Sequence, residues 1–135
     1  MRRTLSLVYE DGRTAHMPLK TIRLELARSK EFPEGNADNA YILKAPLSPD
    51  GHLDVDAWRT KRDLCTVRRF WNGKEEERGL LIHTRGRWAF SYVPDDDADD
   101  EPIFRLDKHV FRPGEYVSIT EHDGVERTFR VASVT

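Results

Sequence analysis

The amino-acid sequence predicts an all-β or β-rich α+β fold: about eight antiparallel strands in a small barrel or a strongly curved sheet, with one short helix. Short runs in which apolar and polar residues alternate recur along the chain, and Gly and Pro separate them. One such run places Trp88, Phe90 and Tyr92 on one face of a strand, because side chains of a strand point to alternate faces. A closed or strongly curved sheet also leaves few exposed strand edges.

Length and composition favour a single β-rich domain over residues 1–135. The chain is 38% hydrophobic and 34% charged, and its formal net charge of −2 argues against nucleic acid as a partner. A single cysteine, Cys65, excludes an internal disulfide and fits a reducing, cytoplasmic compartment. We find no signal-peptide pattern and no apolar run near the ~18 residues of a membrane span, so no membrane partner is expected.

Two hairpins are predicted from one turn chemistry, a three-residue loop that ends in Asp-Gly. The first spans Leu5–Leu19 and the second spans Tyr116–Val134. In the second hairpin this loop aligns Val117 with Phe129, whereas a two-residue loop would oppose Val117 to Arg130. The three-residue loop is therefore favoured, and its glycine supplies the positive φ that the last loop position requires.

Further strands and one helix are expected between the hairpins. The strand candidates are Thr21–Ala27, Asn39–Ala45, Thr66–Trp71, Gly79–Thr84 and Arg87–Val93, followed by a weaker one, Phe104–Phe111, that ends at a Pro113-Gly114 turn. The helix begins after Asp54, a good N-cap residue, and runs to about Leu64. Its apolar residues Val55 and Trp58 lie near one stripe that faces the core.

An Arg/aromatic cluster is the strongest candidate for ligand binding. Its members are Arg69, Trp71, Arg87, Trp88, Tyr92 and His83. Arginine beside exposed aromatic rings can clamp an anionic ligand or stack on bases. Ordinary packing is the competing interpretation, because Arg69 and Trp71 share one face of a strand while Arg68 and Phe70 share the other. Only one face can be the core, so one of the two arginines must be covered, paired or near a rim.

The turn at Gly86 decides the environment of His83. A three-residue loop that ends at Gly86 pairs Ile82 with Trp88 and sends His83 to the outer face. We favour this register because it buries more apolar area. A two-residue loop at Arg85-Gly86 would instead set His83 beside Trp88, where it would be a candidate general base without a visible partner.

No metal, cofactor or catalytic site is predicted. The histidines are scattered, and the acidic run Asp95–Glu101 departs from a calcium loop, with Asp100 where glycine is required. We expect this run to be a solvated loop. Phosphate-binding glycine motifs and the Gly-x-Ser-x-Gly nucleophile motif are missing. Cys65, at the junction between helix and strand, is expected to be a small buried hydrophobe.

Several segments resemble a family of small uncharacterised bacterial proteins. They are Phe111–Ile119 with its Pro113-Gly114-Glu115 turn, the continuation through Gly124 to Val131, Arg87–Tyr92, and the opening Leu5–Met17. The likeness covers most of the chain. The family has no known activity, so the resemblance implies a bacterial, cytoplasmic protein and transfers no site residue.

Three functions remain open. Our first hypothesis is a non-catalytic binding or interaction module with a protein partner, because no spacing assembles a nucleophile, a base or a metal site. The second is a barrel that binds a small anion, with or without enzyme activity, and the third is a small barrel associated with nucleic acid. A filled interior with an exposed apolar patch would favour the first, a hollow pocket the second, and a continuous basic face the third. The sequence indicates no oligomeric state.

Overall fold

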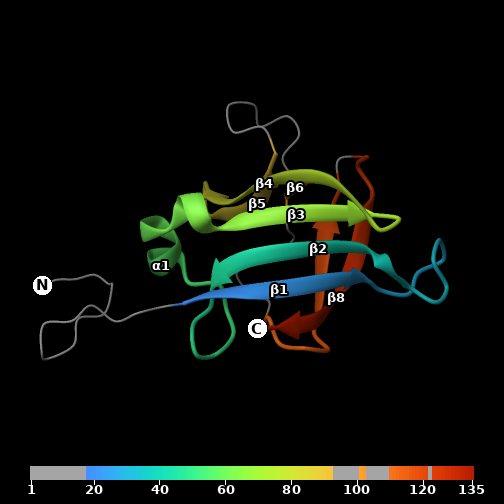
Figure 1. Ribbon diagram of the computed structural model, residues 1–135, viewed down its shortest axis with the longest axis horizontal. Coiled ribbons are helices and arrows are strands. Elements are labelled where there is room, and N and C mark those ends of the chain that lie inside the picture. Colours follow the sequence, from blue (N-terminus) through green and yellow to red (C-terminus); the bar gives the residue numbers. More distant parts are fainter. Residues whose placement is uncertain (1–17, 93–100, 103–109, 122) are drawn as a thin grey trace, which may run out of the picture.

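The computed structural model describes residues 18–92, 101–102, 110–121 and 123–135 (Figure 1). Its strands form one sheet of eight strands in the order β6-β5-β4-β3-β2-β1-β8-β7, with antiparallel pairing between neighbours. The elements in chain order are β1 Leu19–Leu26, β2 Asn36–Pro46, α1 Val55–Thr60, the 3-10 helix η1 Arg62–Leu64, β3 Thr66–Trp71, β4 Lys74–Thr84, β5 Arg87–Ser91, β6 Glu101–Pro102, β7 Tyr116–Thr120 and β8 Glu126–Val134.

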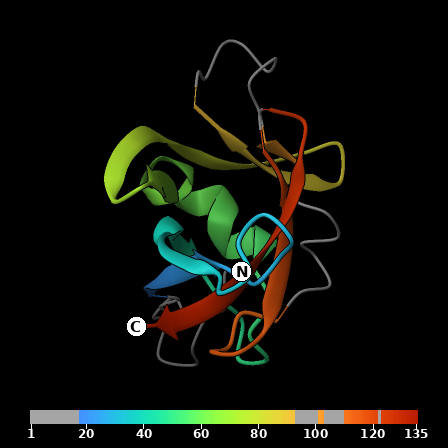
Figure 2. The same ribbon diagram turned by 90° about the vertical axis from the view of Figure 1, so that its right-hand side faces the viewer.

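The sheet curls strongly, so that its two edges approach each other. Strands β1, β2 and β3 cross the front of Figure 1 and β8 crosses behind them, while Figure 2 shows the curl from one end. Cα atoms of the edge strands β6 and β7 come within 8 Å of each other, although the two strands do not pair. The helix α1 covers the end opposite the β3–β4 turn. The predicted strongly curved antiparallel sheet with one short α-helix is confirmed.

The concave side of the sheet is filled by apolar side chains. At its centre, Tyr41 packs against Phe90 and Phe129 with ring centroids 5.1 and 5.0 Å apart. Trp58 reaches into the same core from α1. The described residues of the interior therefore form one packed apolar core.

The hairpin β7–β8 has the predicted register. Val117 pairs with Phe129 and Ile119 with Arg127, and Val117, Ile119 and Phe129 are all buried. Gly124 adopts a φ of 82° in the loop, as the three-residue turn requires. The requirement that apolar side chains of both strands lie on one face thus identified the correct turn.

The register favoured for β4–β5 is wrong. His83 pairs with Trp88 and Thr84 with Arg87, around a two-residue turn in which Arg85 has a φ of 53°. Leu81, not its neighbour on either side, faces the core and is 1% exposed. Packing by the helix explains the choice, because Trp58 of α1 lies against the rings of both His83 and Trp88.

The remaining predictions in the described residues are confirmed with changes in bounds. The α-helix ends at Thr60 rather than near Leu64, and a 3-10 helix occupies Arg62–Leu64. Strand β3 has the predicted bounds, whereas β4 begins at Lys74, because an Asn72-Gly73 turn with positive φ at both residues joins it directly to β3. Asp54 caps α1, since its side chain accepts a hydrogen bond of 2.9 Å from the backbone N–H of Ala57. The turn at Pro113-Gly114 is present, with a φ of 94° at the glycine.

Three predicted segments lie largely outside the described residues. They are the hairpin Leu5–Leu19, of which only Pro18 and Leu19 are described, the acidic run Asp95–Glu101, and the strand Phe104–Phe111. At the end of that last segment, Val110 and Phe111 are described and are not part of a strand.

Candidate functional site

The structure divides the predicted Arg/aromatic cluster between two ends of the sheet. Arg69 and Trp71 belong to the last residues of β3 before the β3–β4 turn, and Figure 1 shows that turn far from α1. His83, Arg87 and Trp88 lie at the other end, where β4 turns into β5. Tyr92 follows β5 and packs against the core. The six residues therefore do not form one cluster.

Arg69 is held by protein groups on all sides. Its Nε and Nη2 donate hydrogen bonds of 3.1 and 2.9 Å to one carboxylate oxygen of Glu121, and its Nη1 donates to Glu76. The hydroxyl of Tyr41 donates to the same Glu121 oxygen over 2.7 Å. Because Arg69 and Glu121 are 6% and 2% exposed, each charge depends on the other for compensation. The prediction that one of the two arginines is covered, paired or near a rim is confirmed, since Arg69 is both covered and paired.

A second arginine, Arg127, completes what we call the Glu121 network (Tyr41, Arg69, Glu121 and Arg127). Its Nη1 donates to the other Glu121 oxygen over 2.8 Å, and its Nε donates to Glu31 over 2.9 Å. These bonds, above all the one to Glu31, raise the pKa of Arg127 despite its partial burial. The guanidinium carbons of Arg69 and Arg127 lie 4.6 and 5.5 Å from the ring centroid of Trp71. This end of the sheet is thus closed by its own ion pairs.

Three aromatic rings pack against one another at the α1 end. The ring centroid of His83 lies 4.6 Å from that of Trp88 and 5.9 Å from that of Trp58, and the two indoles are 5.5 Å apart. Trp58 Nε1 donates to the backbone oxygen of Leu81 over 2.8 Å. The three rings therefore contact one another and the core, and His83 has a structural role in this packing.

A groove of about 660 Å³ runs between β4 and the α1–η1 segment. Leu80 and Ile82 line it from β4, and both are half-buried. Leu64 lines it from η1 and is 57% exposed, the most exposed large hydrophobic side chain of the described residues. These three apolar side chains thus line one groove rather than being scattered over the surface.

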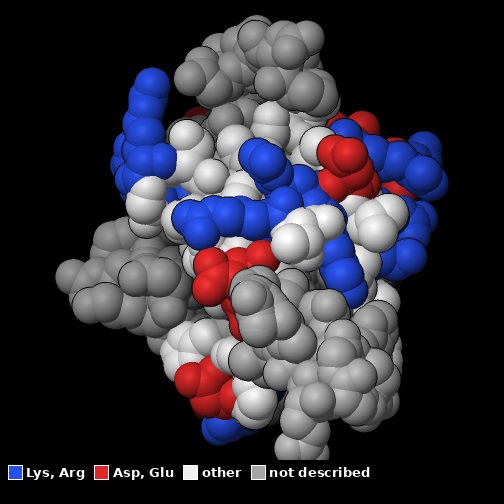
Figure 3. Space-filling view, turned by 90° about the vertical axis from the view of Figure 1, so that its left-hand side faces the viewer, with Lys and Arg blue, Asp and Glu red and all other residues white. Residues whose placement is uncertain are grey.

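The same groove carries an excess of positive charge. Arg59, Lys61 and Arg62 line it, against the single carboxylate of Asp63. Figure 3 looks onto this end of the molecule and shows Lys and Arg side chains spread over much of the described surface. The guanidinium of Arg62 lies 5.5 Å from the Trp58 ring rather than in an ion pair with a described carboxylate. A basic groove in a chain of net charge −2 favours an acidic ligand.

A second groove of about 660 Å³ lies between the β1–β2 connection and the strands β7 and β8. Its charged residues include Arg28 and Arg130, but also Glu25 and Glu34. Since the two signs balance there, this groove favours no class of ligand.

Cys65 is the candidate reactive thiol, and the His, Cys, Asp and Glu side chains of the described residues are the candidate metal ligands. Burial raises the pKa of the Cys65 thiol to about 11, and the side chain packs in the core, which confirms the prediction of a small buried hydrophobe. Within the described ranges, His, Cys, Asp and Glu form no group of three or more that could hold a metal ion.

Comparisons with protein-family models, curated proteins and solved structures find no match to this chain. Among the described helices, none has the length and apolar character needed to cross a membrane.

Sequence reasoning missed the groove, although a signal for it exists. The run Leu80-Leu81-Ile82 places apolar side chains on both faces of one strand, whereas only one face of β4 joins the core. The leftover face therefore needs a second partner. The position of Leu64 opposite that face depends on how η1 folds against β4, which spacing alone does not reveal.

Proposed function

We propose that this protein is a non-catalytic interaction module that binds an acidic segment of a partner protein in the groove between β4 and α1–η1. The observation that carries the proposal is the exposure of Leu64 beside Leu80 and Ile82. An apolar side chain of the partner would bury this surface, and each fully covered apolar side chain contributes about 1.5–3 kcal/mol. The filled interior favours this function over a barrel that encloses a small ligand.

The charge of the groove selects the partner's chemistry. Arg62 lies beside the apolar floor without an ion pair to a described carboxylate, and Arg59 and Lys61 add positive charge, although Arg59 also pairs with Asp56. Carboxylates that flank the partner's apolar side chain would therefore meet positive charge. A basic or neutral segment would gain the apolar contact but not the electrostatic one. The expected ligand is therefore an extended segment in which acidic and apolar residues are interspersed.

The test is a titration of isotope-labelled protein with a synthetic peptide of interspersed Leu and Glu, followed by NMR. We expect the largest shift changes at the amides of Leu64, Leu80 and Ile82. The variant Leu64→Gln should weaken binding about tenfold, because it removes apolar contact without changing charge. Val125→Gln is the matched control: Val125 is also an exposed hydrophobe, 45% exposed, but lies in the β7–β8 loop.

Several outcomes would overturn the proposal. One is unchanged affinity in Leu64→Gln, and another is an equally large loss in Val125→Gln. A nucleic acid that binds the same groove more tightly than the peptide would replace the assigned partner. Sedimentation velocity measures whether the protein is a dimer. A dimer that Leu64→Gln dissociates would mean that a second copy of the chain occupies the groove.

A further inference from the structure

We infer that the β4–β5 turn makes this binding site selective for acidic partners. Arg85 and Arg87 bind oxyanion groups of the partner segment just beyond the apolar side chain that the groove holds. The inference rests on the proposed function and deepens it by assigning the residues that select an acidic partner. Three observations carry it, namely the backbone of Arg85, the lack of ion pairs at this turn, and the face of the sheet on which Arg87 stands.

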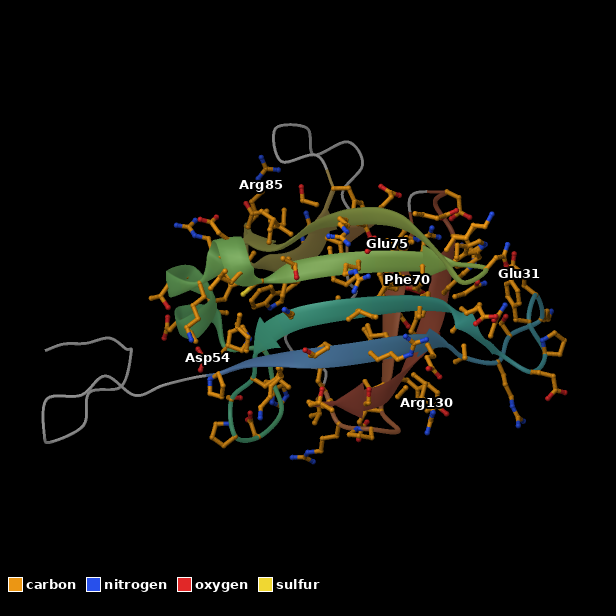
Figure 4. The ribbon with its side chains drawn as sticks, viewed as in Figure 1. Glu31, Asp54, Phe70, Glu75, Arg85 and Arg130 are labelled. Carbon is orange, nitrogen blue, oxygen red and sulfur yellow. The ribbon has the colours of Figure 1, made fainter. Side chains whose placement is uncertain are left out.

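Arg85 occupies a position that suits other residues better. Its φ is 53° and that of Gly86 is 73°, the conformation of a two-residue turn in which Asn, Asp or Gly is preferred. The corresponding turn between β3 and β4 uses Asn72-Gly73. A long side chain at positive φ carries backbone strain that Asn would reduce. This strain is the cost of having an arginine at the tip of the turn. Figure 4 shows Arg85 there, pointing away from the sheet on the side of α1.

The charges of this turn are not neutralised by the described part of the protein. Arg85 and Arg87 are both exposed, and neither has an ion pair with a described carboxylate. Other exposed arginines do: Arg59 pairs with Asp56 over 3.1 Å and Arg78 with Glu75 over 3.0 Å. No described carboxylate therefore competes with an incoming anion for the two guanidinium groups of the turn.

The strand register places Arg87 on the same face of the sheet as Leu80 and Ile82, two of the residues that line the groove. Trp88 points into the core, so Arg87 and its cross-strand partner Thr84 point to the opposite face. Leu80 and Ile82 stand on that same face, because Leu81 between them is in the core. Thr84 follows Ile82 by two residues, about 7 Å along β4. A segment that covers Leu80 and Ile82 thus reaches Arg87 within roughly two residues.

The shared chemistry of the ligand is an oxyanion, either the carboxylate of Glu or Asp or the phosphate of a phosphoserine. Planar guanidinium groups bind both in a bidentate manner. Three peptides separate these sources: the Leu/Glu peptide, the same peptide with one phosphoserine in place of a Glu, and the same peptide with Gln in place of every Glu. Calorimetry at several salt concentrations measures the affinity of each.

The variant Arg85→Asn/Arg87→Gln should bind the Leu/Glu peptide about tenfold more weakly than the wild type at low salt, with a flatter salt dependence. Its affinity for the Gln peptide should not change. A higher melting temperature is expected, because Asn relieves the strain at position 85, so the loss of affinity cannot come from unfolding. Arg130→Gln is the control for the loss of one exposed charge, since Arg130 lies at the opposite end of the molecule (Figure 4).

The outcomes separate the two proposals. If the double variant binds the Leu/Glu peptide as well as the wild type while Leu64→Gln still weakens binding, the inference fails and the proposed function stands. If neither change matters, or if no peptide binds the wild type, both fail. A phosphoserine peptide that binds the wild type at least tenfold more tightly than the Leu/Glu peptide, and loses that advantage in the double variant, assigns phosphate as the preferred oxyanion.

Discussion

Gly124 shows how one backbone angle supports a hairpin. Its φ is 82°, and a Cβ built there would meet no heavy atom within 4 Å. Substitution therefore costs conformational strain and not packing. We expect Gly124→Val to lower the free energy of unfolding by more than about 1 kcal/mol, because β-branched residues resist positive φ. Denaturant titration measures the loss, and Gly124→Asn should lose less; equal stability of the Val variant and the wild type would contradict the register.

Burial makes the thiol of Cys65 unreactive in the folded protein. The residue is fully buried, and burial raises the pKa of its thiol to about 11. At neutral pH the thiol therefore stays protonated and out of reach of solvent. We expect a chromogenic thiol reagent to label one cysteine per chain in denaturant and none in the folded protein. Labelling of the folded protein at the rate of a free thiol would show that this part of the core opens easily.

Asp123 gives the β7–β8 loop a dependence on pH. A hydrogen bond of 3.0 Å from the backbone N–H of Val125 lowers the pKa of Asp123, slight burial opposes it, and Arg127 reinforces it. Because the folded pKa lies below the unfolded value of about 4, the contribution to stability is present above that value and is lost as the pH falls through the folded pKa. Asp123→Asn keeps the acceptor but does not titrate. Unfolding in urea at several pH values should show a flatter acid decline in this variant, and an unchanged decline would contradict the assignment.

At the scale of the element, the two hairpins explain which registers could be predicted. Along β7 and β8, apolar and polar residues alternate cleanly, so only one loop length puts Val117 and Phe129 on one face. In β4 the run Leu80-Leu81-Ile82 is apolar on both faces, so burial alone cannot choose. There the helix decides, since Trp58 packs on His83. The alternation of apolar and polar residues therefore predicts the register of a strand that has one polar face. It fails where both faces are apolar and a distant element packs on one of them.

A close approach between β4 and β5 makes Gly79 indispensable. A Cβ at Gly79 would lie 2.1 Å from the backbone oxygen of Ser91, far inside contact distance. We expect Gly79→Ala to lower the free energy of unfolding by more than about 2 kcal/mol, because one strand must move. The control is Gly73→Ala, where a Cβ meets nothing within 4 Å and only the positive φ is unfavourable. Equal losses in the two variants, measured by thermal denaturation, would contradict the steric explanation.

At the scale of the molecule, the two ends of the curled sheet are built differently. One end is closed by the Glu121 network, and the other by the rings of Trp58, His83 and Trp88. At this second end an open groove remains beside η1. The sequence predicted that an arginine of β3 would be covered, paired or near a rim, but not that Glu121, 52 positions away, would pair with it. It likewise indicated the Arg/aromatic residues but not their division between the ends. Such pairings depend on the curvature of the whole sheet, which local spacing does not contain.

The Glu121 network should contribute far more to stability than an exposed ion pair, because it ties β2, β3 and β8 together across the core. Glu121→Gln leaves Arg69 buried with its main counter-charge removed, and we expect a loss of about 3–5 kcal/mol in the free energy of unfolding. Arg69→Gln/Glu121→Gln should lose less than the sum of the two single changes, because the second change removes the unpaired charge that the first creates. The exposed pair Asp56 and Arg59 is the matched control, and its neutralisation should cost under about 1 kcal/mol.

The comparison of these two cycles by urea denaturation decides how this end of the sheet is held. Strong coupling between Arg69 and Glu121, with almost none between Asp56 and Arg59, is the expected pattern. If Glu121→Gln costs no more than the surface control, the ion pairs merely occupy a space that apolar packing already closes. The stability of the curled sheet would then reside in the stacked rings of Tyr41, Phe90 and Phe129. In either case the charges of Arg69 and Arg127 are engaged internally, which is consistent with the proposal that a partner binds at the α1 end.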